Sequence, residues 1–203
     1  MDSKTLGYYD DNAERLTRAY NGADVSQLHA LLRRVLPVPG RVLEIGCGSG
    51  RDALFMASLG CSVVAADGSE QMLEGARRNF NGANAGEITV FHAPFPLPPE
   101  HPFLSEKFDA IVAVAMLMHI PNDELMHFAR QIGALLKADG VFVCSFCTGS
   151  HEAEDGRLYV DREPGDVVRL FENVGFRLLH RETTKDGLGR EIAWTTLVLD
   201  VEV

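Results

Sequence analysis

Short apolar runs alternate with amphipathic stretches along most of the chain. Between the apolar runs, hydrophobic residues recur at the three- and four-residue spacing that is typical of helices. Strands that alternate with helices in this way indicate βαβ units and a parallel sheet. The predicted strands are 41–45, 61–66, 88–92, 108–114 and 140–146, and the predicted helices follow Gly50, Ser69 and Pro121.

Two helical segments precede the first predicted strand. Residues 5–20 are amphipathic but rich in Tyr and Asn, whereas residues 25–36 have a stronger helical pattern that Asp24 would cap. We therefore expect a single domain over the whole chain, in which residues 1–36 form a helical lid and residues 41–203 form the core.

The pattern changes near the C-terminus. Residues 164–174 predict a helix, and residues 176–184 and 191–201 predict two strands that a turn at 186–189 joins as a hairpin. The sequence therefore predicts an α/β fold: a doubly wound, mostly parallel seven-stranded sheet with an antiparallel C-terminal hairpin and an N-terminal helical lid. The residues Lys137 to Gly140 are expected to end the helix after Pro121 with a glycine stop.

A glycine-rich loop is the strongest chemical signal. The strand 41–45 leads into Gly46, Gly48 and Gly50, and a helix begins directly afterwards. A loop without Cβ atoms lets a ligand lie against the backbone, and the helix start offers free N–H groups. Asp67 ends the next strand, where an acid can accept the hydroxyls of a nucleoside ribose.

The spacing of this loop separates two kinds of nucleoside cofactor. Gly50 comes one position earlier than the last glycine of the G-x-G-x-x-G dinucleotide fingerprint, and Arg51 holds that position instead. Glu44 would repel a pyrophosphate, but it would help to hold an ammonium or a sulfonium group. A carboxylate inside a buried strand is costly unless it is paired, so Glu44 indicates a cationic ligand such as S-adenosylmethionine.

Several segments together resemble one family. The segments 44–50, 66–69, 108–112, 117–119 and 135–142 resemble motifs of the Rossmann-like (class I) S-adenosylmethionine-dependent methyltransferases. The resemblance covers roughly residues 6–203. Within this superfamily, residues 8–13 and Trp194 are similar to small bacterial methyltransferases of the tellurite-resistance type.

The resemblance implies a cofactor, S-adenosyl-L-methionine, and a small-molecule acceptor that attacks through oxygen, nitrogen, sulfur or a metalloid. The glycine loop would line the methionine and ribose, Glu44 would hold the amino group, and Asp67 would accept the ribose hydroxyls. Gly68, Met72 and Ala93 would contact the adenine, and Ala113 would contact the methionine portion. The implied cofactor-binding residues are Glu44, Gly46, Cys47, Gly48, Gly50, Asp67, Gly68, Met72, Ala93 and Ala113.

One segment departs from the family pattern. Many relatives place an Asp after the third strand to bind the adenine amine, whereas this chain has His-Ala-Pro-Phe at residues 92–95. The adenine contact would therefore come from the backbone, or from stacking on Phe95.

Two residues are candidates for a catalytic base, which a hydroxyl or ammonium acceptor would need. His119 follows the fourth strand, although a His that packs or caps near a helix start is equally common. Tyr9 could supply a hydroxyl if the first helix folds over the cofactor, or it could be a core aromatic. The polar stretch after the fifth strand would face the acceptor through His151, Glu152, Arg157, Tyr159 and Arg162.

Composition and charge exclude several classes. A formal net charge of −10, with 29 acidic against 19 basic residues, disfavours nucleic-acid binding. No run approaches the roughly 20 apolar residues of a membrane span, and the polar N-terminus lacks a signal peptide, so we expect a cytoplasmic protein. The four Cys are expected to be reduced and mostly buried, and the Cys144/Cys147 pair lacks the other ligands of a structural zinc, so no metal is predicted.

Two other functions remain as alternatives. A nicotinamide-dependent oxidoreductase is disfavoured by the glycine spacing and by the absence of a Tyr-x-x-x-Lys catalytic pair. A non-catalytic module that binds S-adenosylmethionine is compatible with every motif above, because cofactor binding and transfer use different residues.

Overall fold

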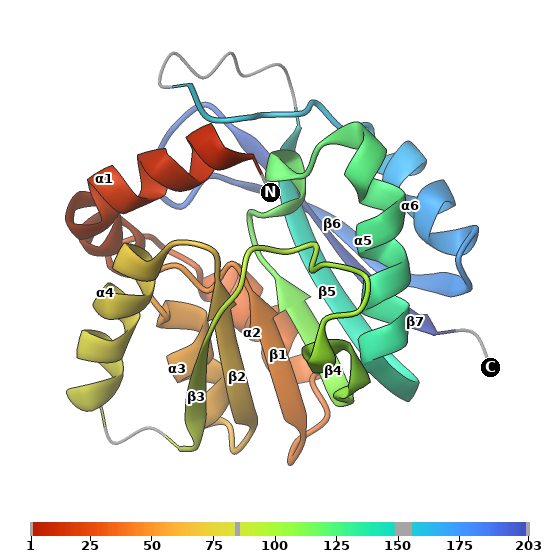
Figure 1. Cartoon of the computed structure of the whole chain (residues 1–203), viewed down its shortest axis with the longest axis horizontal. Coiled ribbons are helices and arrows are strands. Elements are labelled where there is room, and N and C mark those ends of the chain that lie inside the picture. Colours follow the sequence, from red (N-terminus) through yellow and green to blue (C-terminus); the bar gives the residue numbers. More distant parts are fainter. Residues whose placement is uncertain (1, 84–85, 149–155, 202–203) are drawn as a thin grey trace.

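A seven-stranded sheet forms the centre of the molecule in the computed structural model, which describes residues 2–83, 86–148 and 156–201 (Figure 1). Among these residues the strand order is β3-β2-β1-β4-β5-β7-β6. The first five strands are mutually parallel, and β7 is antiparallel to both β5 and β6, which confirms the predicted fold class. The strands are β1 (Arg41–Ile45), β2 (Ser62–Asp67), β3 (Ile88–His92), β4 (Phe108–Ala113), β5 (Leu136–Thr148), β6 (Phe176–Lys185) and β7 (Ala193–Val201).

Helices cover both faces of the sheet. On one face, Leu32 of α2 and Met56 of α3 pack on apolar side chains of the central strands, and on the other face Phe128 of α5 and Phe171 of α6 do so. This double cover explains why the parallel strands read as continuous apolar runs. The helices are α1 (Ser3–Asn21), α2 (Ser26–Val35), α3 (Arg51–Ser58), α4 (Glu70–Asn81), α5 (Asn122–Leu135) and α6 (Pro164–Glu172), with 3₁₀ turns η1 (Pro102–Ser105) and η2 (Leu117–His119).

The predicted glycine stop after α5 is wrong. The helix ends at Leu135 and the chain enters β5 at once, four residues before the predicted start of this strand at Gly140. The residue in the left-handed conformation is Asp139 (φ 62°), not Gly140. Asp tolerates this conformation better than most residues because its short polar side chain can bond locally.

Two other helix starts differ in how they are capped. The Ser69 hydroxyl accepts the Met72 N–H at 3.1 Å and caps α4. The prediction that Asp24 is the N-cap of the second helix is wrong by one residue, because α2 begins at Ser26 and its N-cap is Val25, which makes no side-chain hydrogen bond there. The Asp24 carboxylate still accepts the Ser26 N–H at 3.0 Å.

The first helix packs across α4 (Figure 1). Ala13 and Leu16 of α1 are buried against Met72 of α4, and Tyr8, Tyr9 and Tyr20 pack around them. No helix within the described ranges is long and apolar enough to cross a membrane. All four Cys are free and buried, as predicted.

Candidate functional site

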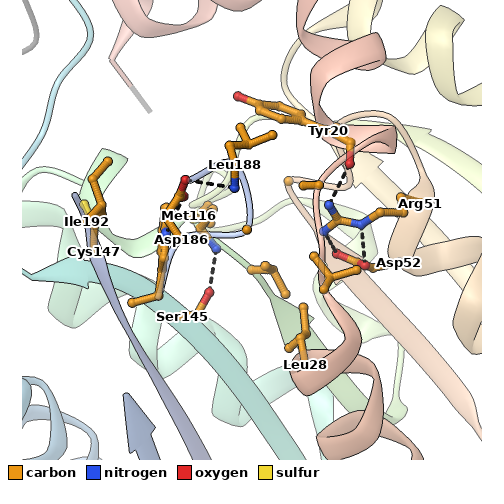
Figure 2. Close-up of a pocket in the computed structure, with 18 of the residues that line it drawn as sticks. Tyr20, Leu28, Arg51, Asp52, Met116, Ser145, Cys147, Asp186, Leu188 and Ile192 are labelled. Carbon is orange, nitrogen blue, oxygen red and sulfur yellow. Dashed lines mark hydrogen bonds and ion pairs between the residues drawn. The ribbon is translucent and has the colours of Figure 1, made fainter. Parts of the chain in front are cut away.

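A cavity of about 920 Å³ lies where β1, β2 and β4 end. Ligand cavities of small molecules span roughly 300–1,000 Å³, so this cavity can hold a cofactor and an acceptor together. Residues of α1, of the link between α1 and α2, and of the β6–β7 turn cover it (Figure 2). Its floor is formed by Glu44, Gly46, Cys47, Gly48, Asp67, Ala115, Met116, Ser145 and Cys147.

The glycine loop is held in a conformation that only glycine adopts readily. Gly46, Gly48 and Gly50 have φ angles of 73°, 53° and 76°. The N–H groups of Gly46 and Cys47 both donate to the Ala66 carbonyl, at 2.8 and 2.9 Å, which ties the loop to the end of β2. Gly50 does not line the cavity. A Cβ there would overlap the Phe80 ring of α4, so this glycine is required for packing.

Glu44 contributes an unpaired carboxylate oxygen to the cavity. Its side chain is only 2% exposed, and its Oε2 has no hydrogen-bond partner among the described residues. Burial raises the pKa of this carboxyl well above its usual value, and the nearby charge of Asp52 raises it further. A buried carboxylate oxygen without a donor is costly, so the site is arranged for a ligand with N–H groups or a positive charge.

Asp67 links the two loops that border the cavity. Its Oδ2 accepts the Gly48 N–H at 2.8 Å and its Oδ1 accepts the Ser69 N–H at 2.9 Å. Burial raises the pKa of Asp67, while these backbone donors oppose that effect. Each carboxylate oxygen keeps a second lone pair, so both can accept a hydroxyl without losing their present bonds.

Four of the implied cofactor residues do not line this cavity: Gly68, Met72 and Ala93, which were expected at the adenine, and Ala113, which was expected at the methionine portion. Leu6 of α1 covers Gly68, because a Cβ on that glycine would lie 2.7 Å from Leu6 Cδ2. Of the two adenine contacts left open, the backbone or stacking on Phe95, the structure disfavours the second. Phe95 is 1% exposed and packs edge-on against Phe103 inside the core.

The two catalytic candidates contact one another. The Tyr9 hydroxyl lies 3.0 Å from His119 Nε2, although the two residues are 110 positions apart. His119 is 2% exposed, and its Nδ1 lies 2.7 Å from the Leu158 carbonyl oxygen. Both residues line the cavity. The fold therefore brings the first helix, the turn after β4 and the segment after β5 together at one point.

The residues of the polar stretch after β5 differ in where they lie relative to the cavity. Arg157 and Tyr159 line the cavity, whereas His151 and Glu152 lie outside the described residues. Arg162 was a candidate for facing the acceptor, but its guanidinium is buried and bonds the Leu117 and Ile120 carbonyls on either side of His119. Burial lowers the pKa of Arg162 to about 10.

Replacing Arg162 should destabilise the fold. We expect Arg162→Met to lower the free energy of unfolding by about 2–3 kcal/mol, because buried carbonyls lose their donors. Denaturant titration measures this loss. Arg169→Met is the matched control, since Arg169 is exposed on α6 and should change stability by about 0.5 kcal/mol or less. Equal stabilities for the two variants would contradict the role of Arg162.

The contacts that hold the β6–β7 turn over the cavity were not predicted from the sequence. The Asp24 N–H donates to the Gly187 carbonyl at 3.1 Å, which docks the β6–β7 turn against the α1–α2 link. Asp186 holds this turn together by accepting the Trp194 indole N–H at 2.9 Å and the Arg190 guanidinium at 2.7 Å. No local signal predicts the Asp24–Gly187 contact, because these two residues are more than 150 positions apart along the chain.

Arg51 was also missed, although it stands beside the glycine loop. Figure 2 shows its guanidinium between the Tyr20 carbonyl (2.8 Å) and both oxygens of Asp52. The same aspartate bonds His29 of α2 at 2.8 Å. Across the described ranges, no group of three His, Cys, Asp or Glu side chains is placed to hold a metal ion.

The chain has the Rossmann-like (class I) methyltransferase fold. Its features are a parallel sheet with a glycine loop after β1, an acid at the end of β2, and an antiparallel hairpin that completes the sheet. Residues 42–140 match a family model described as "Methyltransferase domain". This match, over just under half of the chain, confirms the resemblance to the S-adenosylmethionine-dependent methyltransferases. The finer likeness to the tellurite-resistance type stays a prediction.

Curated relatives and solved structures agree with this resemblance. The chain is 27% identical over 157 residues to the uncharacterized methyltransferase YodH of Bacillus subtilis, covering 76% of this chain and 60% of the relative. It is 33% identical over 125 residues to a demethylmenaquinone methyltransferase of Clavibacter sepedonicus, covering 59% of this chain and 46% of the relative. The chain thus spans only about half the length of the curated relatives it matches.

Solved structures share the fold over almost the whole chain. Magnesium protoporphyrin IX methyltransferase from Synechocystis, with bound S-adenosylmethionine, has a TM-score of 0.77 at 19% identity, covering 100% of this chain and 98% of its own. A 1,6-didemethyltoxoflavin-N1-methyltransferase from Burkholderia thailandensis has a TM-score of 0.74 at 20% identity, covering 98% of this chain and 85% of its own.

Proposed function

We propose that this protein binds S-adenosylmethionine in the cavity and transfers its methyl group to a small-molecule acceptor. The observation that carries the proposal is the buried, unpaired Glu44 Oε2 beside the glycine loop. When bound, the cofactor supplies a methyl group on a sulfonium, which is already electrophilic. The protein then has to bind the cofactor, align the acceptor and exclude water.

The residues present fit this cofactor. Glu44 would hold the amino group through the oxygen that otherwise lacks a donor, and Asp67 would accept the ribose hydroxyls through its remaining lone pairs. Gly46, Cys47 and Gly48 would let the methionine and ribose lie against the backbone. Because Leu6 lies against Gly68, the adenine side would be bounded by α1.

The opposite part of the cavity would receive the acceptor. Its walls carry Tyr9, His119, Tyr159 and Trp194, so aromatic and hydrogen-bonding groups meet there. The acceptor could attack through oxygen, nitrogen, sulfur or a metalloid, and Tyr9 and His119 are the residues placed to take up a proton. The relative named for demethylmenaquinone and the structural neighbour named for 1,6-didemethyltoxoflavin also support a small-molecule acceptor.

Calorimetric titration with S-adenosylhomocysteine and, separately, with NADH tests the proposal. We expect saturable binding of S-adenosylhomocysteine and none of NADH. Binding of NADH alone would favour an oxidoreductase and overturn the proposal. If the protein binds S-adenosylhomocysteine but forms no methylated product from a metabolite mixture, the result would favour the alternative function, a non-catalytic module that binds S-adenosylmethionine.

Asp67→Ala should weaken S-adenosylhomocysteine binding by about 1.5–3 kcal/mol, the usual loss for a charged hydrogen-bond acceptor. The structure adds a second effect, because the Gly48 and Ser69 N–H groups lose their acceptor and stability should fall as well. Calorimetry and thermal unfolding measure the two effects. Glu74→Ala, on the exposed side of α4, is the control, and an Asp67→Ala affinity equal to that of the control would contradict the ribose role.

A further inference from the structure

We propose that the methyl acceptor is a hydroxyl group on a flat ring, and that Tyr9 takes its proton while passing its own proton to His119. This inference rests on the proposed function and names the acceptor class of the same cavity. It starts from two contacts of the His119 ring, one with the Tyr9 hydroxyl and one with the Leu158 carbonyl.

The bonds of His119 fix which ring nitrogen carries the proton. A carbonyl oxygen can only accept, so the Nδ1 that lies 2.7 Å from the Leu158 carbonyl carries the hydrogen. In a neutral imidazole the other nitrogen, Nε2, is then a hydrogen-bond acceptor. The Tyr9 hydroxyl, 3.0 Å away, therefore donates to Nε2. Within this pair, His119 Nε2 is placed to accept the proton that Tyr9 gives up.

Tyr9 is suited to relay a proton rather than to act as an anion. Burial raises the pKa of Tyr9 well above its usual value, although the nearby positive charge of Arg157 opposes the shift. A protonated phenol can accept a second proton only while it gives up its own. In the step we propose, the acceptor oxygen forms a bond to the methyl carbon and the carbon–sulfur pair stays on sulfur. The acceptor proton moves to the Tyr9 oxygen, and the Tyr9 proton moves to His119 Nε2.

The chemistry around the relay favours a hydroxyl over other nucleophiles. A thiol is acidic enough to react without a base. A protonated amine would have to lie near Arg157, whose guanidinium is stacked 4.4 Å from the Tyr8 ring centroid and 5.0 Å from that of Tyr159. Its charge also acts on Tyr9 and Tyr20, so an ammonium would be repelled there. A hydroxyl is neutral and needs a base.

The walls indicate a flat acceptor. Tyr9, Tyr159 and Trp194 line the cavity, and the Tyr159 ring meets the His119 ring edge-on at 4.8 Å between centroids. Aromatic side chains bury planar rings well, because faces and edges interact favourably. A ring hydroxyl would lie in the plane of its ring and could point at the Tyr9 oxygen.

The test begins with methyl-labelled S-adenosylmethionine and a metabolite extract, incubated with the full chain and analysed by mass spectrometry. We expect a labelled ring O-methyl product. With its acceptor, Tyr9→Phe and His119→Asn should each lower kcat/KM about 100-fold or more while S-adenosylhomocysteine affinity stays at the wild-type value. The Asn amide can still donate to the Leu158 carbonyl, so His119→Asn removes the proton acceptor and keeps that bond. Tyr8→Phe is the matched control and should keep wild-type kinetics, because the Tyr8 hydroxyl contacts Arg15 outside the cavity.

An analogue of the acceptor separates proton transfer from packing. If a thiol replaces the reacting hydroxyl, Tyr9→Phe should methylate it within a few-fold of the wild-type rate. A Tyr9→Phe variant equally slow with both compounds, or fully active with the hydroxyl compound, would overturn the relay. A labelled N- or S-methyl product would also overturn it while leaving the proposed function intact. The absence of any labelled product would contradict the proposed function itself, and the relay with it.

Discussion

Gly48→Val should abolish measurable binding of S-adenosylhomocysteine while the chain still folds. Gly48 has a φ of 53°, which a β-branched residue rarely adopts, and a Cβ added there would lie 3.5 Å from Met72 Cε and 3.8 Å from the Tyr20 ring. A valine would project its methyl groups toward the region that we assign to the ribose and methionine. We expect the affinity for S-adenosylhomocysteine to fall about 100-fold or more, so that calorimetry would detect no heat of binding.

The control for this variant isolates backbone strain. Gly175 has a φ of 88° with open space around it, and it lies between α6 and β6, away from the cavity. Gly175→Val should therefore have a similar cost in stability and leave binding unchanged. If Gly48→Val binds S-adenosylhomocysteine as tightly as Gly175→Val does, the glycine loop is only a turn.

The second large effect concerns Glu44. Because burial raises its pKa, part of the carboxyl population is protonated before the cofactor binds, and a bound ammonium group should drive that proton off. We therefore expect proton release on binding, and an affinity for S-adenosylhomocysteine that rises with pH until Glu44 is ionised in the free protein. Titrations in buffers of different ionisation enthalpy measure the released proton.

Glu44→Gln should remove both effects and weaken binding by about 1.5–3 kcal/mol, the range for a hydrogen bond to a charged group. Glu74→Gln, on the surface of α4, should behave like the wild type. Proton release that persists in Glu44→Gln would place the titrating group elsewhere and remove the main argument for an ammonium beside Glu44.

The fold could be predicted closely because its signals are local. Buried parallel strands read as apolar runs, and Ser69 caps α4 through a bond to a residue three positions later. The superfamily resemblance was confirmed for the same reason, since its main motifs are short and lie in the turns after strands. The errors arose where local signals competed: Gly140 was the obvious helix stop, but Asp139 adopts the left-handed conformation instead.

The cofactor and acceptor sides of the cavity differ in how far they could be predicted. Glu44, Gly48 and Asp67 follow from position and spacing, and the structure brings them together. The Tyr9–His119 contact and the docking of Gly187 against Asp24 depend on long-range packing, which a single sequence does not encode in any short pattern. Phe95 shows that position along the chain can also mislead. It follows the third strand, where an adenine contact was expected, but its side chain packs in the hydrophobic core.

The most direct measurement is a crystal structure of the full chain with S-adenosylhomocysteine. The account predicts the ligand amino nitrogen within hydrogen-bond distance of Glu44 Oε2, the ribose hydroxyls on Asp67, and the sulfur facing the part of the cavity that holds Tyr9 and His119. A ligand bound elsewhere, or bound in the cavity with Glu44 still unpaired, would contradict it.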